Sequence, residues 1–320
     1  MLKAIMSSNL KALDVNATLK DAAELMVSSG IRRIPVTVAG NIVGVVSART
    51  VVKEAVSNQN WASEKLSDLA KPAITVDPDT PFRTAAKIMV KYGIGSLIVK
   101  GQGIVTERDL AKVIPRVTIP AISVGTTNVL ILPSDSTVMD AAKSMISLGI
   151  SHIPVNSGAD VIGLVSLRDV LKAVYEGNTS QKLSDIASKS LVYEDIDASV
   201  EDIADLIVSK YVGAVPLFEG EPKAANLRGI ITEWDLVRLY ASMARAHVLI
   251  KADPSKIRGL VAALMATPRV YDVAIVYGPY DLLVTIDVED PDLIGTTVVN
   301  SIASMSGVKE TTTLIEAEQI

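Results

Sequence analysis

The chain has 320 residues, of which 49% are hydrophobic and 4% aromatic, and its formal net charge is −5. A chain of this length divides into two or more compact units, and its apolar content predicts packed domains instead of disorder. It contains no cysteine, which excludes disulfides, thiolate metal sites and cysteine nucleophiles. The N-terminus lacks the apolar core of a signal peptide, and no apolar run approaches the roughly 20 residues that span a bilayer. We therefore expect a soluble cytoplasmic protein that contacts no membrane and, lacking a long basic run, no nucleic acid.

Four copies of one unit follow each other along the chain. The stretch Gly-Ile-Arg-Arg-Ile-Pro-Val at residues 30–36 returns as Gly-Ile-Ser-His-Ile-Pro-Val at residues 149–155, with weaker copies at 93–99 and 211–217. Each copy is followed by a glycine-led apolar strand that ends in a hydroxyl residue. These residues are Ser47, Thr106, Ser166 and Thr232, which are 59, 60 and 66 residues apart. Repetition at this spacing predicts a repeat architecture.

Each unit begins with a short strand, such as residues 73–76 or 129–132, and continues with a helix. The pairs Thr18-x-x-Asp21, Thr137-x-x-Asp140 and Ser199-x-x-Asp202 have the spacing of a capping box and predict three helix starts. In the second unit we expect Thr80 as the N-cap and Pro81 as the first helical residue.

One position in the middle of these helices is apolar in every unit. It is occupied by Met26, Met89, Met145 and Ile207. Its recurrence favours core packing over a methionine-lined binding surface. Two further strands and a second helix, starting near Ala48, Arg108, Arg168 or Trp234, complete each unit.

These residues resemble the CBS domain family over about residues 1–244. The resemblance implies an α/β (α+β) fold with one repeat each in residues 1–57, 58–118, 119–177 and 178–244. In that family two repeats pack through their sheets into a pair, the Bateman module, whose clefts hold adenosine-containing ligands such as AMP, ATP or S-adenosylmethionine. Two such pairs in one chain resemble the regulatory γ subunit of AMP-activated protein kinase.

The most informative motif is Ser/Thr-x-x-Asp at the junction between the last strand and the second helix. A carboxylate there can accept hydrogen bonds from both ribose hydroxyls, while the hydroxyl and the helix N-terminus can face a phosphate. The same residues would also serve simply as helix caps, and the two roles are compatible. The family resemblance favours ligand binding, above all for Asp109 and Asp169. The motif residues are Thr106, Arg108 and Asp109, then Ser166, Arg168 and Asp169, and finally Thr232 and Asp235.

The first and fourth units depart from this motif. The first has Thr50 where the others have aspartate, and a threonine cannot grip a diol with a charged acceptor. We therefore expect its site to be empty or weak. The fourth keeps Asp235 but has Trp234 where units two and three have arginine, so its preference for phosphate stays open.

A second set of candidate residues precedes the strand in each unit. In the family, backbone groups at this place meet the adenine edge, and basic side chains reach phosphates across the cleft. Arg32, Arg33 and His152 fit the phosphate role, although the two arginines could equally form a solvated surface pair. His152 has no second His or Cys at a matching spacing, so we expect no metal site. Backbone contacts are expected from Gly95, Ser96, Ser151, Gly213 and Ala214.

Residues 245–320 follow a different pattern. A strand at 248–250, a helix from Asp253-Pro254, a hairpin at 273–277 and 282–288, a helix from Asp290-Pro291 and a strand at 311–316 predict a ferredoxin-like βαββαβ unit. In the second hairpin strand, the even-numbered residues are apolar and suit helix cover. Leu283, Thr285 and Asp287 alternate with them and predict a partner-facing surface.

The segments Gly-Pro-Tyr-Asp at 278–281 and Gly-Val-Lys-Glu-Thr-Thr-Thr at 307–313 look like the effector domain of the Lrp/AsnC regulators. That domain is known for dimerising and for binding amino acids at its dimer interfaces. The resemblance implies a homodimer through residues 246–320. Whether the domain senses an amino acid or only dimerises stays open, and the helix-turn-helix of those regulators is absent.

No constellation in the sequence suits an enzyme, since there is neither a phosphate-binding G-x-x-x-x-G-K-[ST] loop nor a nucleophile elbow. We expect a non-catalytic regulatory protein without a cofactor, in which an adenine nucleotide is the regulatory ligand. The alternative is an assembly module whose C-terminal domain senses an amino acid. The regulated partner protein and the nucleotide stay open.

Overall fold

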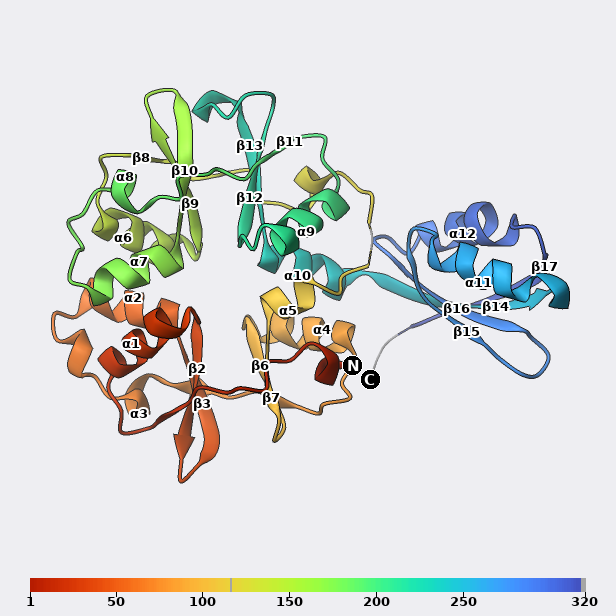
Figure 1. The fold of residues 1–320 in the computed structure, drawn as a ribbon, viewed down its shortest axis with the longest axis horizontal. Helices are drawn as coiled ribbons and strands as arrows, with labels where there is room; N and C mark the ends of the chain where they lie inside the picture. The colour runs from red at the N-terminus through yellow and green to blue at the C-terminus, as the bar shows by residue number, and fades with distance from the viewer. Residues whose placement is uncertain (116, 318–320) are drawn as a thin grey trace.

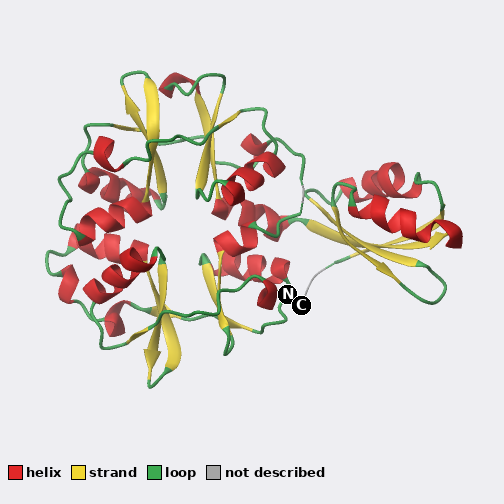
Figure 2. Ribbon diagram, in the orientation of Figure 1, coloured by secondary structure: helices red, strands yellow, loops and turns green. Residues whose placement is uncertain are grey.

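The computed structural model describes residues 1–115 and 117–317 of the chain. Its first three quarters form four similar units, repeats 1 to 4, which Figure 1 shows arranged as a ring. A fifth unit lies at one side of the ring, beyond the last helix of repeat 4. In Figure 2 the strands of repeats 1 and 2 face each other across one half of the ring, and those of repeats 3 and 4 across the other.

Each repeat has the order strand, helix, two strands, helix. Repeat 1 contains β1 (Leu13–Asp14), α1 (Leu19–Ser29), β2 (Arg33–Val38), β3 (Asn41–Ser47) and α2 (Ala48–Ser57). After α3 (Leu66–Leu69) and β4 (Lys71–Pro72), repeat 2 contains β5 (Thr75–Val76), α4 (Phe82–Tyr92), β6 (Ser96–Val99), β7 (Gly103–Thr106) and α5 (Glu107–Ala111).

The second half of the ring repeats this order. Repeat 3 contains β8 (Leu132–Pro133), α6 (Val138–Leu148), β9 (His152–Ser157), β10 (Asp160–Ser166) and α7 (Leu167–Tyr175). After α8 (Leu183–Ile186), repeat 4 contains β11 (Glu194–Asp195), α9 (Val200–Ser209), β12 (Ala214–Phe218), β13 (Leu227–Thr232) and α10 (Glu233–Ser242).

The sheet of every repeat is built alike, with the first strand parallel to the second and the second antiparallel to the third. The first strands are shorter than the sequence predicts, since β5 and β8 each form only two residue pairs with their neighbour. The predicted strands at 73–76 and 129–132 are therefore too long. Only Thr75 and Val76 pair in the first, and the second pairs through Leu132 and Pro133.

Two hydrophobic cores hold the ring together, and each is shared by repeats that are not adjacent in sequence. Helices of repeats 1 and 3 pack into one core, and helices of repeats 2 and 4 into the other. The recurrent apolar position lies in these cores, as predicted, and none of its four side chains is more than 2% exposed: Met26, Met89, Met145 and Ile207. The apolar surface that these contacts bury stabilises the ring by roughly 25 cal/mol per Å².

Neighbouring repeats exchange the segments that lead into them. The helix α3 precedes repeat 2 but packs on repeat 1, where the backbone N–H of Leu66 donates to the carbonyl of Ala17 at 3.0 Å. The N-terminal 3-10 helix Leu2–Ala4 packs in turn on repeat 2, where the N–H of Leu2 donates to the carbonyl of Thr80 at 3.1 Å. Repeats 3 and 4 exchange α8 and residues 117–125 in the same way. Each pair is therefore interlocked as well as packed.

The predicted capping boxes are present at the starts of α1, α6 and α9. In each, the hydroxyl accepts from the backbone N–H of the aspartate, and the aspartate accepts from the N-cap backbone. Repeat 2 differs, because α4 begins at Phe82 and its N-cap is Pro81, with φ −61° and ψ 147°. The extended Pro81 lies before the first helical turn, so the prediction of Thr80 as the N-cap is wrong by one residue.

The C-terminal unit is a four-stranded antiparallel sheet with helices over one face. It contains β14 (Ala244–Ala252), α11 (Ile257–Met265), β15 (Val270–Ile275), β16 (Leu282–Val288), α12 (Leu293–Thr297), a π-helical segment (Val298–Ala303) and β17 (Val308–Ile315). The strand order β15-β16-β14-β17 is that of the predicted βαββαβ unit. Three strands differ from the prediction in where they begin and end. The strands β14 and β17 are longer than the expected strands at 248–250 and 311–316, and β15 begins and ends before the expected strand at 273–277.

The junction between the ring and this unit is tight. Only Met243 separates α10 from β14. The guanidinium of Arg245 donates two hydrogen bonds, of 2.7 and 2.6 Å, to the carboxylate of Asp287, which is completely buried. A second link joins Arg83 of α4 to Glu316 at 3.1 Å. Asp287 is therefore covered within the chain, and its predicted place on a partner-facing surface is wrong.

Candidate functional site

The Ser/Thr-x-x-Asp motifs cap the second helices of repeats 2, 3 and 4. In each motif one carboxylate oxygen of the aspartate accepts from both the backbone N–H and the hydroxyl of the N-cap residue, at 2.6–3.0 Å. The other oxygen of Asp109 pairs with Lys112 at 3.2 Å, and that of Asp235 lies 3.7 Å from Arg238. The second oxygen of Asp169 has no such partner among the described residues. The capping role predicted as the alternative is thus present, and it leaves one oxygen of Asp169 for a ligand.

Two cavities lie at equivalent places in repeats 1 and 3, one beside Ser47 and Thr50 and the other beside the motif of repeat 3. One, of about 280 Å³, is lined by α2 with Ser47, Arg49 and Thr50, and by α3 with Asp68. The other, of about 270 Å³, is lined by α7 and α8. Both volumes are close to the lower end of ligand-sized pockets, roughly 300 Å³. The second cavity contains Asp169, so the structure places this predicted ribose ligand in a cavity.

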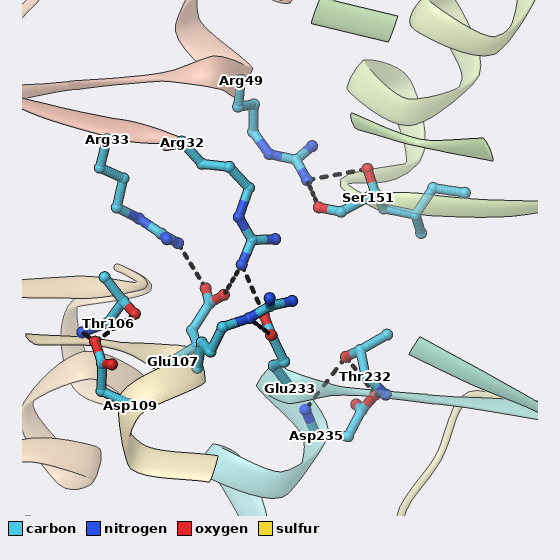
Figure 3. A network of polar contacts seen from close by, with 12 residues as sticks. Arg32, Arg33, Arg49, Thr106, Glu107, Asp109, Ser151, Thr232, Glu233 and Asp235 are labelled. Carbon is cyan, nitrogen blue, oxygen red and sulfur yellow. Dashed lines mark hydrogen bonds and ion pairs between the residues drawn. The ribbon is translucent and has the colours of Figure 1, made fainter. Parts of the chain in front are cut away.

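The predicted phosphate ligands Arg32 and Arg33 lie at the centre of the ring (Figure 3). Arg32 donates to Glu233 at 2.6 Å and lies 4.0 Å from Glu107, while Arg33 donates to Glu107 at 2.8 Å. Arg108 donates through its Nε to the second oxygen of Glu233. The arginine side chains are only 14–18% exposed, and that of Glu233 is 2% exposed. The alternative of a solvated arginine pair is therefore wrong.

An arginine of repeat 1 that the sequence analysis did not select connects this centre to repeat 3. Arg49, on α2 of repeat 1, donates to the carbonyls of Met145 and Ile150 at 3.0 Å each. It also donates to the hydroxyl of Ser151 at 2.8 Å, as Figure 3 shows. Repeat 3 also supplies two charged or titratable groups that interact electrostatically with Arg32 and Glu233, namely His152 and Arg168.

We call the resulting group the central cluster: Arg32, Arg33, Arg49, Glu107, Arg108, His152, Arg168 and Glu233. Five arginines and two glutamates leave an excess of three positive charges. Three of its buried nitrogen atoms have no hydrogen-bond partner among the described residues, and they are Nη1 of Arg108, Nε of Arg168 and Nδ1 of His152. Buried polar atoms are normally paired, so these three nitrogen atoms leave hydrogen-bonding capacity unused in the cluster.

The electrostatics of the cluster follow from its burial and its excess of arginine. Burial opposes ionisation of Glu233, but Arg32 and Arg108 outweigh it and hold its pKa below the ordinary value. Burial, reinforced by Arg32 and Arg108, lowers the pKa of Arg168. Burial and then Arg32 lower the pKa of His152 from 6.5 to about 4. At neutral pH His152 is therefore uncharged and can donate one hydrogen bond and accept another.

The structure explains why glycine precedes two of the strands, because neighbouring side chains come too close to leave space for a Cβ atom. A Cβ on Gly95 would stand 1.8 Å from Nη2 of Arg33 and 1.9 Å from Oε1 of Glu107. A Cβ on Gly213 would stand 2.7 Å from Nε2 of His152. The carbonyls of Gly95, Ser151 and Gly213 each accept a hydrogen bond from the first residue of the following helix, at 2.8–3.2 Å. The predicted adenine contacts of these residues, of Ser96 and of Ala214 stay predictions.

The sequence analysis missed Glu107 and Glu233, although both stand inside the motifs that it quoted. A signal was present, because the second motif position is glutamate in repeats 2 and 4 but Ala48 and Leu167 in repeats 1 and 3. The alternation becomes meaningful only when all four repeats meet at one point.

The family models that match the chain agree with this architecture. The CBS domain model matches residues 2–57, 66–116, 121–176 and 183–242, and the Lrp/AsnC ligand binding domain model matches residues 245–320. The chain belongs to the CBS domain family, with four CBS domains followed by a C-terminal Lrp/AsnC ligand-binding domain.

Several archaeal proteins are similar over the ring. The MJ1225 protein of Methanocaldococcus jannaschii, described as a candidate archaeal homologue of g-AMPK, is 21% identical over 283 residues, which are 75% of this chain and 99% of that protein. Its crystal structure superposes with a TM-score of 0.63. A conserved protein of Pyrococcus horikoshii superposes with a TM-score of 0.52 at 20% identity, covering 75% of this chain and 99% of that one. These likenesses confirm the four-repeat fold.

Some of the relatives bear the names of enzymes. The inosine-5'-monophosphate dehydrogenase of Methanocaldococcus jannaschii is 26% identical over 285 residues, but these cover only 56% of that protein. In the described part of this chain no group of three or more His, Asp or Glu side chains is placed to hold a metal ion. No helix within residues 1–115 and 117–317 has both the length and the apolar character needed to cross a membrane.

Proposed function

We propose that the ring is a non-catalytic sensor of adenosine-containing nucleotides, with AMP or ATP as the regulatory ligand and S-adenosylmethionine, which carries no phosphate, as the second candidate. The observation that carries this proposal is the central cluster, where groups from all four repeats leave three positive charges in excess beside the Ser/Thr-x-x-Asp motifs. Buried excess charge of one sign is costly unless it is compensated. Phosphate groups supply that compensation, and arginine binds them with strong, charge-assisted hydrogen bonds.

The cavity in repeat 3 is the best placed for a nucleoside. Asp169 retains one carboxylate oxygen for a ribose hydroxyl, and the preceding residue, Arg168, belongs to the central cluster. A ribose held at Asp169 would therefore direct an attached phosphate chain towards the centre. The nucleotide is a ligand in this proposal and takes part in no reaction.

Repeats 1 and 2 are poorer hosts for ribose, for different reasons. Repeat 1 has a cavity, but Thr50 replaces the aspartate. Repeat 2 has Asp109, but Lys112 already pairs with its second oxygen. We propose that repeat 1 contributes mainly phosphate-binding arginines and that Lys112 must move for Asp109 to hold a ribose.

The helix α10 offers a route from the ring to the C-terminal domain. Its first residue, Glu233, lies in the central cluster, and its last turn leads directly into β14, where Arg245 binds Asp287. A change at the centre that moves α10 would therefore move the C-terminal sheet. We propose that this domain passes the nucleotide signal to a dimer partner or to another protein.

Calorimetry on the full chain tests the proposal. Adenosine, AMP, ATP, S-adenosylmethionine and a set of amino acids would be titrated under identical salt conditions. Binding of at least one adenosine-containing ligand is expected. If only an amino acid binds, the alternative holds, in which the C-terminal domain carries the ligand and the ring is structural.

A further inference from the structure

The two glutamates of the central cluster hold the arginines in the way that a bound anion would. The carboxylate of Glu233 accepts from Arg32 on one oxygen and from Arg108 on the other. The carboxylate of Glu107 accepts from Arg33 at 2.8 Å. Three guanidinium groups are thus linked through two carboxylates, and each carboxylate lies where a phosphate group would make the same contacts.

The positions of these glutamates in the repeats are not those of structural caps. In repeats 1 and 3 the same place is occupied by Ala48 and Leu167, and the helices that follow still begin there. The capping bonds come instead from the first and fourth residues of each motif. The carboxylates are therefore free of a local role, and their three arginine partners are 74, 125 and 201 residues away in sequence.

We infer that Glu107 and Glu233 are built-in competitors of phosphate, which occupy the arginines of the central cluster until a polyanionic ligand displaces them. This inference deepens the proposed nucleotide sensor by assigning its selectivity. The ligand class is a di- or triphosphate, because Glu107 holds Arg33 while Glu233 holds Arg32 and Arg108, and replacing carboxylates at two places takes two phosphate groups.

The charge balance explains why a ligand with more phosphate groups should bind more tightly. With both carboxylates in place the cluster has an excess of three positive charges, which attracts anions but leaves only part of its donors free. Nη1 of Arg108 and Nε of Arg168 are buried without a partner among the described residues, so they can donate to a phosphate once it has entered the cluster. Further phosphates gain full contact only by taking Arg32 and Arg33 from the glutamates. Each added phosphate therefore strengthens binding by displacing a weaker internal partner.

The inference also predicts a coupling to α10. Release of Glu233 by a triphosphate frees the first residue of that helix, which is otherwise held by Arg32 and Arg108. A monophosphate that contacts only the free donors would leave Glu233 bound. Triphosphate and monophosphate ligands should therefore differ in their effect on the C-terminal domain as well as in affinity.

The test uses the full chain and four probes: inorganic tripolyphosphate, ATP, AMP and adenosine. Glu233→Gln and Glu107→Gln each remove one competing charge while keeping the side-chain size. We expect each variant to bind tripolyphosphate and ATP about tenfold more tightly than the wild type, because one opposing charge is lost a few ångströms from the ligand. Affinity for adenosine should not change. Glu219→Gln, which removes an exposed carboxylate paired with Arg228, is the matched control and should leave every affinity unchanged.

Weaker or unchanged binding of tripolyphosphate in Glu107→Gln would overturn the inference, because the glutamates would then position the arginines for phosphate instead of competing for them. Glu107 is partly exposed and pairs mainly with Arg33, so this variant decides the matter even if Glu233→Gln fails to fold. Tripolyphosphate carries no adenosine. If it behaves as expected while no adenosine-containing ligand binds, the inference stands and the nucleotide proposal fails. If ATP binds but the variants do not strengthen it, the reverse holds.

Discussion

The ring of Tyr211 lies against the guanidinium of Arg108, with 4.1 Å between the ring centroid and the guanidinium carbon. Tyr211 has a left-handed backbone, with φ 57°, at the end of α9. Repeats 1 to 3 have glycine at this place, with φ between 62° and 71°. A left-handed tyrosine is strained by comparison with glycine. Its contact with a member of the central cluster is a further feature that distinguishes repeat 4 from the other three repeats.

Substitutions at Tyr211 separate this strain from the ring contact. Tyr211→Ala keeps the strain and loses the ring, and it should lower the free energy of unfolding by about 0.5–1 kcal/mol. Tyr211→Gly also loses the ring but relieves the strain, and it should be about 1 kcal/mol more stable than the alanine variant. Tyr211→Phe should match the wild type. Urea unfolding measures all three, and equal stability of the glycine and alanine variants would show that the left-handed backbone carries no strain.

The two aspartates of capping boxes in repeat 3 allow a matched test of the ribose site. Asp140 caps α6 and Asp169 caps α7 with the same bonds, but of the two only Asp169 lines one of the two cavities described above. Replacing either by Asn should cost about 1 kcal/mol of stability through the weakened cap. AMP or ATP at a hundredfold excess over its Kd should stabilise Asp140→Asn by about 2.7 kcal/mol, as in the wild type. In Asp169→Asn this stabilisation by the nucleotide should be smaller. Thermal unfolding with and without nucleotide measures it. Stabilisation equal to that of the wild type would rule out the ribose role of Asp169.

The sequence predicted local features, such as the capping boxes, but not the contacts between residues that are distant in the chain. The capping boxes were predictable because Thr18 and Asp21 are three residues apart and meet in any helix. The four repeats were predictable because their strands recur at nearly constant spacing. Pro81 was misplaced by one residue, since proline suits both the N-cap and the first turn. A β-strand of two residues, such as β5, gives almost no periodicity to detect.

The missed part of the site depends on contacts between repeats. Arg32 meets Glu233 only because repeats 1 and 4 both reach the ring centre, and that relation follows from how the cores are shared, which no local pattern encodes. The cover of Asp287 by Arg245 was missed for a similar reason. Strand alternation placed Asp287 on the open face correctly, but it could not show that the neighbouring strand supplies a guanidinium there.

His152 predicts a specific dependence of stability on pH. Its pKa is about 4 in the folded protein, through burial and then Arg32, and about 6.5 in the unfolded chain. The unfolded chain therefore binds the proton more readily, so the contribution of neutral His152 is complete above pH 6.5 and is lost as the pH falls towards 4. Between pH 7 and pH 5 the loss should be about 2 kcal/mol.

His152→Gln removes this titration and serves as the comparison. The difference between its free energies of unfolding at pH 7 and pH 5 should be smaller than that of the wild type by most of this amount. The second histidine, His247, is present in both proteins and drops out of the comparison. Equal pH dependence would show that His152 is protonated as readily in the folded protein as in the unfolded chain.

The pair of Arg245 and Asp287 should be decisive for the stability of the junction. Asp287→Ala leaves the guanidinium of Arg245 buried without its carboxylate, which typically costs about 3–5 kcal/mol. Burial opposes the charge of Arg245, and Asp287 outweighs it by raising the pKa of that group, so Arg245 stays charged. Glu310→Ala removes an exposed partner of Lys251 in the same domain and should cost less than about 1 kcal/mol. Chemical unfolding compares the two, and similar small losses would mean that water reaches Arg245.

The open face of the C-terminal sheet should form the dimer contact through its uncovered part. Leu314 lies on that face opposite His247 and is 53% exposed, whereas its neighbour Ile315 pairs with Ala246 on the helix-covered face and is 63% exposed. Side chains that oppose each other across two strands share a face, so these adjacent residues point to opposite sides of the sheet and have similar exposure.

Leu314→Lys should convert a dimer into a monomer, because it places a charge in an apolar symmetric contact. Ile315→Lys should leave the dimer intact. Light scattering on the full chain measures both, and a dimer that survives Leu314→Lys would place the interface on the ring or on the helices instead.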